Sequence, residues 1–328
     1  MSRRPSLHLV PSGESVRWLQ AESRARFQPR NVFLKPGWTA HARDQGESLF
    51  LELVHESRRL GLLTVQDWRL PGAFRQWTLL AEPDLLDPDV TQAETLDALL
   101  SLARRNSVDL VQSFSNMARW TDPAIPGRLA DGELTPFGTY VVDLSGGLDA
   151  VIAGMHGQHR RLMRKGHKAA VEVRDSVDAR AFVALMNETY ERGGRKQPFP
   201  ERYLERLIDD PQVPLIAVSA HAEGTLQAAV LVPHDGRRGY YLHGGSRARA
   251  TPGASVLAHL RVMERLLEQG TPQYDLGGAR RETDDQRLAG IFRFKRHFGG
   301  YFEDCVRWRL ALTMVGRAVR AGARRLGG

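Results

Sequence analysis

The chain has 328 residues, 42% of them hydrophobic and 26% charged, with a formal net charge of +8. This length favours two domains over one small core, and the composition is typical of a globular protein rather than a fibrous or disordered one. The positive charge favours an anionic partner such as a nucleic acid, a nucleotide diphosphate or a membrane surface, although basic proteins are also common in some genomes.

The single cysteine, Cys305, excludes an internal disulfide and a cysteine-based zinc site. Residues 302–310 alternate like a strand, so we expect Cys305 to be a buried structural thiol rather than a nucleophile. No apolar run approaches the roughly 20 residues of a membrane span. No apolar segment follows the cations Arg3 and Arg4, as it would in a signal peptide. We expect a cytoplasmic protein, with contact to the inner face of the membrane left open.

The N-terminal half indicates mixed helices and strands. Helices are expected at 15–26 and 89–106, and strands at 49–55, 58–66, 108–113 and 135–144. Ser145-Gly146-Gly147 breaks the last of these strands, so we place the boundary of a first domain, residues 1–145, at this point.

The second half continues in the same style. Helices are expected within 148–167 and at 178–192, 200–209 and 254–269, and strands at 214–221, 225–233, 238–244 and 273–276. This order of helices and strands resembles acyltransferase folds of the GNAT type. The two halves have a similar order of elements, which suggests a duplicated domain. We therefore expect an α+β chain of two tandem GNAT-like domains without a long coiled-coil insertion. The second domain would be 146–305, and the basic tail 306–328 would pack back on the first.

A basic helix is expected at residues 158–168. Its cations are Arg160, Arg161, Arg164, Lys165 and Lys168. Arg160, Arg164 and Lys168 are spaced to align on one face, where like charges repel by a few tenths of a kcal/mol each. A bound anion explains such a face, and an ordinary solvated helix surface explains it equally well.

Two further segments combine glycine with polar side chains. Arg192-Gly193-Gly194-Arg195-Lys196 follows a helix, and guanidinium groups on such a loop can fork onto phosphate oxygens. Tyr240 to Arg247 ends a strand in Gly244-Gly245, which lets a substrate pass close to the backbone. A basic loop and a plain turn are the competing interpretations.

The segment Gly290 to Gly300 is the most informative of the chain. Phe292, Phe294 and Phe298 stand among Arg293, Lys295 and His297, and two glycines end the segment. The pattern indicates a cationic group held by buried rings near backbone that a substrate approaches closely.

Several chemistries have no support in the sequence. A phosphate-binding loop, a nucleophile elbow and histidines at metal-ligand spacing are absent. The usual acyl-CoA loop before a helix is also missing, because residues 249–254 approach it with one residue too many and with Pro252 inside it.

Taken together, residues 159–168, 240–241, 274–278 and 290–300 resemble the Fem family of peptidoglycan interpeptide-bridge aminoacyltransferases, the FemX, FemA and FemB group. Residues 32–38 are similar to the family's early aromatic–tryptophan element, with Lys35-Pro36 in place of its usual polar residue. Because the chain lacks the long helical hairpin of FemA and FemB, it resembles the compact FemX form more closely.

The resemblance implies transfer of an amino acid, with glycine, alanine or serine expected, from aminoacyl-tRNA to the side-chain amine of a peptidoglycan precursor. The acceptor would be a UDP-MurNAc-peptide or a lipid-linked precursor, and the enzyme would be a monomer that needs no cofactor and no metal. Lys295 would stabilise the negative charge of the reaction, and the Phe294 carbonyl would orient the amine.

The resemblance also points to binding residues, while the arginines among them and the cations of the basic helix are assigned by charge and position. Candidate substrate-binding residues are Trp38, Arg43, Arg192, Arg195, Tyr241, Arg247, Asp275, Gly277 and Gly278. Candidate tRNA-binding residues are the five cations of the basic helix. Two other functions stay open: an acyl-CoA-dependent N-acyltransferase of the broader GNAT superfamily, and a non-catalytic binding module.

Overall fold

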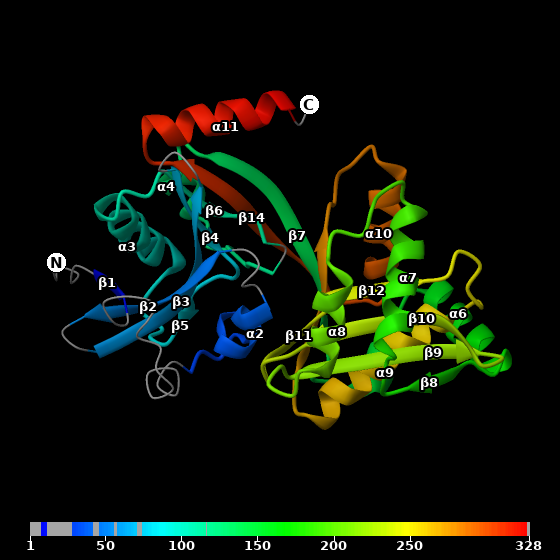
Figure 1. The fold of residues 1–328 in the computed structure, drawn as a ribbon. Coiled ribbons are helices and arrows are strands. Elements are labelled where there is room, and N and C mark those ends of the chain that lie inside the picture. The colour runs from blue at the N-terminus through cyan, green and yellow to red at the C-terminus, as the bar shows by residue number, and fades with distance from the viewer. Residues whose placement is uncertain are drawn as a thin grey trace. The chain divides into compact units, whose positions relative to one another are not determined.

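The computed structural model describes residues 8–11, 28–41, 46–55, 58–70, 74–115 and 117–326. The chain forms two compact units, residues 1–137 with 304–328, and residues 138–303 (Figure 1). It passes between them through strands β7 (Glu133–Asp143) and β14 (Tyr301–Ala311). The expected helix at 15–26 lies outside the described residues.

The first unit contains a mostly antiparallel sheet. Its strands follow the order β1 (His8–Pro11), β2 (Glu47–His55), β3 (Arg58–Leu70), β4 (Phe74–Leu79), β6 (Leu110–Ser113) and β14, and β5 (Asp84–Leu85) pairs with β3. β4 and β6 are parallel. A parallel pair needs a crossover, and α3 (Gln92–Arg105) supplies it, starting at a capping box of Thr91 and Glu94.

The core of the first unit is built by α3 and by three tryptophans, two of them in strands of the sheet. Leu96 and Leu99 of α3 are fully buried in one cluster with Trp77, Trp120 and Trp308. Smaller elements complete the unit: the 3-10 turn η2 (Val32–Leu34) and the helices α2 (Pro36–His41), α4 (Ile125–Arg128) and α11 (Met314–Leu326).

The second unit divides its strands between two sheets. The first, antiparallel, has the order β8 (Glu172–Arg174), β9 (Leu215–Ala222), β10 (Thr225–Pro233) and β12 (His243–Ser246). In the second, β13 (Gln273–Ala279) pairs antiparallel with β7 and parallel with β11 (Arg238–Tyr240). The helices are α5 (Gly147–Gly154), α6 (Gly157–Lys168), α7 (Ala179–Glu191), α8 (Glu201–Asp209), α9 (Ala254–Glu268) and α10 (Gln286–Arg296).

Helices cover both faces of the antiparallel sheet, and β10 shows why. Successive side chains of a strand point to opposite faces. Val230 and Val232 lie in one cluster with Met263 of α9, whereas Ala229 and Leu231 lie in another cluster with residues of α7 and α8. An apolar run of this kind is typical of a strand buried on both sides.

Most expected elements are confirmed within a few residues, but the single strand expected at 238–244 is wrong. The segment is two short strands in different sheets, β11 beside β13 and β12 beside β10. The change of sheet occurs at Tyr241 and Leu242, whose amides donate to Asp275 O at 2.8 Å and to Leu231 O at 3.1 Å. Local sequence cannot reveal this change, because it depends on which strands lie on either side.

The aromatic and cationic segment 290–300 begins within α10, where Lys295 is buried, and Phe298 is buried just after the helix ends. Cys305 is buried as expected. The longest described helix, α9, has 15 residues, so no long coiled coil occurs in the part of the chain described. None of the described helices combines the length and apolar character that crossing a membrane requires.

Candidate active site

The register of strand β13 against β7 shifts between Asp275 and Gly278, and this irregular stretch of backbone, called here the Asp275 turn, places a buried carboxylate beside two glycines. The side chain of Asp275 is fully buried, and its Oδ1 accepts hydrogen bonds from the Gly277 amide at 2.7 Å and from the Thr139 hydroxyl. Gly277 has φ +76°, and a Cβ there would lie 3.0 Å from the Tyr241 carbonyl oxygen. Only glycine combines this backbone conformation with so close an approach.

Lys295 of α10 reaches this turn. Its side chain is 7% exposed, and Nζ donates to the Gly278 carbonyl oxygen at 2.7 Å. The same nitrogen lies 5.8 Å from the centre of the Tyr241 ring. A buried ammonium is costly unless polar groups compensate it, and here a carbonyl and an aromatic face do so. The structure therefore brings together Lys295, Tyr241, Asp275, Gly277 and Gly278.

A neutral histidine lies among the rings next to Lys295. His259 of α9 is 2% exposed and its Nδ1 lies 2.8 Å from the Tyr274 hydroxyl. Burial, together with the charges of His159 and Lys295, lowers the pKa of His259 to about 3. Burial also raises the pKa of Tyr241 to about 12. Both groups are therefore neutral at neutral pH and leave the charge to Lys295.

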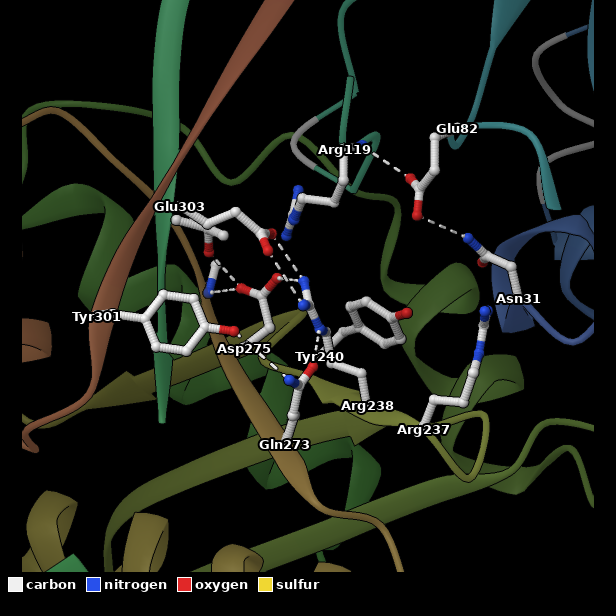
Figure 2. Close-up of polar contacts among 12 residues, drawn as sticks. Asn31, Glu82, Arg119, Arg237, Arg238, Tyr240, Gln273, Asp275, Tyr301 and Glu303 are labelled. Carbon is white, nitrogen blue, oxygen red and sulfur yellow. Dashed lines mark hydrogen bonds and ion pairs between the residues drawn. The ribbon is translucent and has the colours of Figure 1, made fainter. Parts of the chain in front are cut away.

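An arginine from β11 supports the Asp275 turn from the other side. Arg238 donates to both carboxylate oxygens of Glu303, at 2.8 and 3.2 Å, and its Nη1 lies 3.6 Å from Asp275 Oδ2. Its Nε donates to Gln273 at 3.0 Å. Figure 2 shows the guanidinium next to both carboxylates, with the Gln273 side chain beside it.

The electrostatic balance of this group keeps Arg238 charged. Burial by itself would lower the pKa of Arg238, but hydrogen bonds and charge attraction from Glu303, with Asp275 adding to them, raise it overall. Sequence reasoning missed Arg238, Glu303, Thr139 and His259. Arg238 and Glu303 lie 65 positions apart, and only the order of strands in the sheet brings them together.

Phe294, next to Lys295 in the sequence, packs between His259 and His159. The ring centres of Phe294 and His159 are 5.1 Å apart. Burial, with a contribution from His297, lowers the pKa of His159 to about 4. Phe294, whose backbone carbonyl was expected to orient an amine, thus packs its ring against a histidine ring.

Three candidate arginines gather around the C-terminal end of α7. Arg192 Nη1 donates to Ser246 O at 2.9 Å, and the Arg195 guanidinium lies 4.9 Å from the centre of the Tyr190 ring. Arg247 Nε donates to Leu226 O at 2.6 Å. Each of the three thus has a contact within the protein.

The basic helix α6 separates its cations into two groups. Arg160 turns back, and its Nη1 donates to Ala153 O at 2.9 Å and to Met155 O at 2.5 Å, at the end of α5. The other four cations point to solvent. They are Arg161, Arg164, Lys165 and Lys168. The face expected from Arg160, Arg164 and Lys168 therefore lacks Arg160, whose guanidinium satisfies helix-end carbonyls.

The glycine pair after Tyr241 serves packing. A Cβ on Gly244 would lie 2.6 Å from the Tyr241 side chain, and one on Gly245 would lie 2.5 Å from Thr189 Oγ1. Side chains of the protein already occupy both positions, so the pair allows β12 to approach α7 and Tyr241 closely.

Candidates from the early aromatic–tryptophan element lie in the first unit. Trp38 is buried and its ring meets Phe33 edge-on at 4.8 Å. This element is held by Glu82, whose carboxylate accepts from the Asn31 side chain at 3.1 Å and from the Arg119 amide at 2.7 Å (Figure 2). Arg43 lies outside the described residues. Within those described, no group of three or more His, Cys, Asp or Glu side chains is placed to hold a metal ion.

Comparison with known proteins supports the fold described above. Residues 153–296 match the family model of the acetyltransferase (GNAT) domain. A crystal structure of FemX superimposes with a TM-score of 0.66 and 15% sequence identity, over 86% of this chain and 92% of that chain. The chain has the fold of FemX. The expected resemblance is thereby confirmed at the level of the fold, as is the mixed α+β class.

Two other structures share the FemX fold. A conserved protein of unknown function from Bacteroides thetaiotaomicron VPI-5482 has a TM-score of 0.56 at 12% identity, over 89% of this chain and 96% of that one. L-PGS from Bacillus licheniformis has a TM-score of 0.53 at 13% identity, over 88% and 91%. No curated protein sequence matches the chain significantly.

Proposed function

We propose that this protein is an aminoacyltransferase that moves an amino acid from aminoacyl-tRNA to the side-chain amine of a peptidoglycan precursor. One observation carries the proposal: a buried lysine ammonium is fixed beside the Asp275–Gly278 turn in a chain with the FemX fold. We place the reaction in the cytoplasm, where charged tRNA is available, and the acceptor is a UDP-MurNAc-peptide or its lipid-linked form.

The chemistry needs one stabilised negative charge. The acceptor amine attacks the ester carbonyl carbon, and the carbonyl electron pair moves to oxygen. When the tetrahedral intermediate collapses, an amide forms and the ribose oxygen leaves, taking up the proton that the amine loses. Lys295 supplies positive charge to the carbonyl or ribose oxygen at each stage, and preorganised charge of this kind in a buried site contributes several kcal/mol.

The packing at the start of α9 supports an ester donor over an acyl-CoA. A helix N-terminus is a common place for a diphosphate. Gly253, immediately before α9, has φ +99°, and a Cβ there would lie 2.2 Å from Leu162 O and 2.8 Å from the Gly166 amide nitrogen. The main chain of α6 thus lies directly against the start of α9. The glycine-rich loop that binds acyl-CoA before this helix in acyl-CoA-dependent enzymes is also missing from the sequence.

The exposed cations of α6 support an RNA-linked donor. Arg161, Arg164, Lys165 and Lys168 are spaced three and four residues apart and all four are exposed. Like charges at this spacing repel one another, and a bound anion would offset that repulsion. Phosphates of the tRNA acceptor arm would provide that anion.

Replacement of Lys295 tests the proposal. Lys295→Met keeps the side-chain length and removes the charge, so transfer from charged tRNA should fall by at least about 100-fold, which corresponds to about 2.7 kcal/mol. The assay uses purified protein, glycyl-, alanyl- and seryl-tRNA, and both acceptors. Arg180→Met, at an exposed cation of α7 outside the candidate binding residues, is the control and should retain full activity.

Three results would contradict the proposal. One is near-wild-type transfer by Lys295→Met with an unchanged unfolding temperature. Another is tight calorimetric binding of acetyl-CoA together with acetylation of an amine, which would establish the acyl-CoA alternative. The third is a wild-type protein that is inactive with every charged tRNA, which would favour a binding module.

A further inference from the structure

Helix α11 attaches to the first unit along a narrow face. A Cβ on Gly316 would lie 2.1 Å from Asp109 O, so the helix touches the main chain of the unit at this glycine. The Gly316 amide donates to Thr313 Oγ1 at 3.1 Å, and the Thr313 hydroxyl donates to Asp109. One turn later, Arg320 donates to Asp131 O at 3.1 Å. Gly316 and Arg320, four residues apart, define the attached face.

Away from this face, α11 exposes apolar side chains. Met314 is 74% exposed, Val315 is 52% exposed and Val319 is 43% exposed. Only seven large apolar side chains are exposed in the described part of the chain, and three of them stand within these six residues. Val315 and Val319 are four residues apart and therefore share one side of the helix. A cluster of this kind on a water-facing helix marks an interaction surface.

Positive charge accompanies this apolar surface. From Thr313 to Gly328 the sequence contains four arginines and no acidic residue. Arg317 lies exposed on the described part of α11, and Arg324 and Arg325 add two further charges in the sequence. Helices that combine an apolar side with arginine or lysine lie in the interface of anionic membranes.

We propose that α11 binds the surface of an anionic lipid bilayer, inserting Met314, Val315 and Val319 at the level of the headgroups. The helix has 13 residues, about 20 Å at 1.5 Å per residue, so it lies on the bilayer and does not span its hydrocarbon core. RNA would pair with the arginines but leave the three apolar side chains in water. A second copy of α11 would bring like charges together. Attachment to the bilayer is independent of the reaction proposed above.

Vesicle binding by the full chain tests this assignment. Flotation with phosphatidylcholine vesicles, with and without phosphatidylglycerol, should show binding that requires phosphatidylglycerol and weakens as salt is raised. Val315→Ser combined with Val319→Ser should weaken binding about tenfold or more, and Arg317→Gln about fivefold. Leu86→Ser removes an equally exposed apolar side chain elsewhere in the first unit and should change nothing.

Three results would overturn the proposal. The first is a wild-type chain that ignores anionic vesicles. The second is a double serine variant that binds them as the wild type does while unfolding at the same temperature. The third is a wild-type protein that sediments as a dimer while the double serine variant sediments as a monomer. That result would assign the apolar surface of α11 to contact with a second copy of the chain.

Discussion

Lys295 is held in a nearly closed position because the neighbouring turn presents the Gly278 carbonyl oxygen to its Nζ. The turn depends on Asp275, which holds the Gly277 amide, and Asp275 faces Arg238. Arg238 is in turn held by both oxygens of Glu303. Arg238 thus acts through Asp275 on the carbonyl that binds Lys295, and we consider it a positioning residue rather than a catalytic one.

Arg238→Lys separates positioning from simple stability. Lysine keeps the charge but cannot make the forked contact with Glu303, so the Asp275 turn should loosen. We expect kcat for amino acid transfer to fall about tenfold with KM little changed, because a misplaced lysine costs transition-state stabilisation.

The control is an arginine of similar burial. Arg309 donates to Gln112 at 2.9 Å and lies 3.8 Å from Glu133 in the first unit. Arg309→Lys should lower the unfolding temperature by a comparable amount without changing kcat. Equal effects of the two substitutions on kcat would show that Arg238 has no positioning role.

At the scale of elements, helix α6 packs against α5 and α9 with some residues and exposes cations to solvent with their neighbours. Arg160 closes the end of α5, and Gly166 packs so tightly on α9 that a Cβ would lie 2.7 Å from the Leu257 side chain. These inward contacts fix the helix and direct Arg161, Arg164 and Lys168 to solvent. The helix that carries the basic surface is therefore held against α5 and α9.

Substitutions on α6 distinguish its two faces. Arg164→Gln combined with Lys168→Gln should weaken tRNA binding and reduce the slope of log K against log salt by about 0.7 to 0.9 for each phosphate that the helix no longer binds. Arg160→Gln should leave that slope unchanged and lower the unfolding temperature, since two carbonyls lose their donor. Fluorescence anisotropy with labelled tRNA measures the slope, and thermal unfolding measures the stability.

The exposed Arg180→Gln on α7 serves as the control for loss of charge alone. If it matched the effect of the α6 pair, binding would depend on net charge rather than on this surface.

For the molecule as a whole, buried neutral histidines link stability to pH. Burial lowers the pKa of His243 to about 3, from an ordinary value of 6.5. The ring packs against Phe199 and Tyr203. Because the folded pKa lies below the unfolded one, the unfolded chain binds the additional proton. The stability that comes from burying this histidine in its neutral form is therefore fully present above pH 6.5 and is lost as the pH falls toward 3.

His243→Leu should flatten this dependence. Each such histidine contributes a slope of up to about 1.4 kcal/mol per pH unit, so the variant should lose less stability than the wild type as the pH falls from about 6.5 to about 4. Urea unfolding at several pH values measures the slope. His167→Gln, at an exposed histidine of α6, is the control. A slope in His243→Leu equal to that of the wild type would exclude a contribution from His243.

Much of the fold could be predicted from the sequence, because periodicity, caps and turn residues act over a few neighbours. The Thr91–Glu94 capping box starts α3, and Gly270 with φ +70° follows α9. The resemblance at 274–278 and 290–300 located Lys295 and the Asp275 turn, which the structure joins through the hydrogen bond to Gly278. What the sequence determined by itself was thus the α+β class and the lysine at the centre of the site.

The tertiary structure alone decided how distant segments meet. It divided residues 238–244 between two sheets, placed Arg238 against Asp275 and Glu303, and turned Arg160 onto the end of α5. These contacts depend on strand order and helix packing, and no local periodicity encodes which strand lies at the neighbouring position. The sequence therefore specified the chemical groups, and the packing of the sheets determined which of them act together.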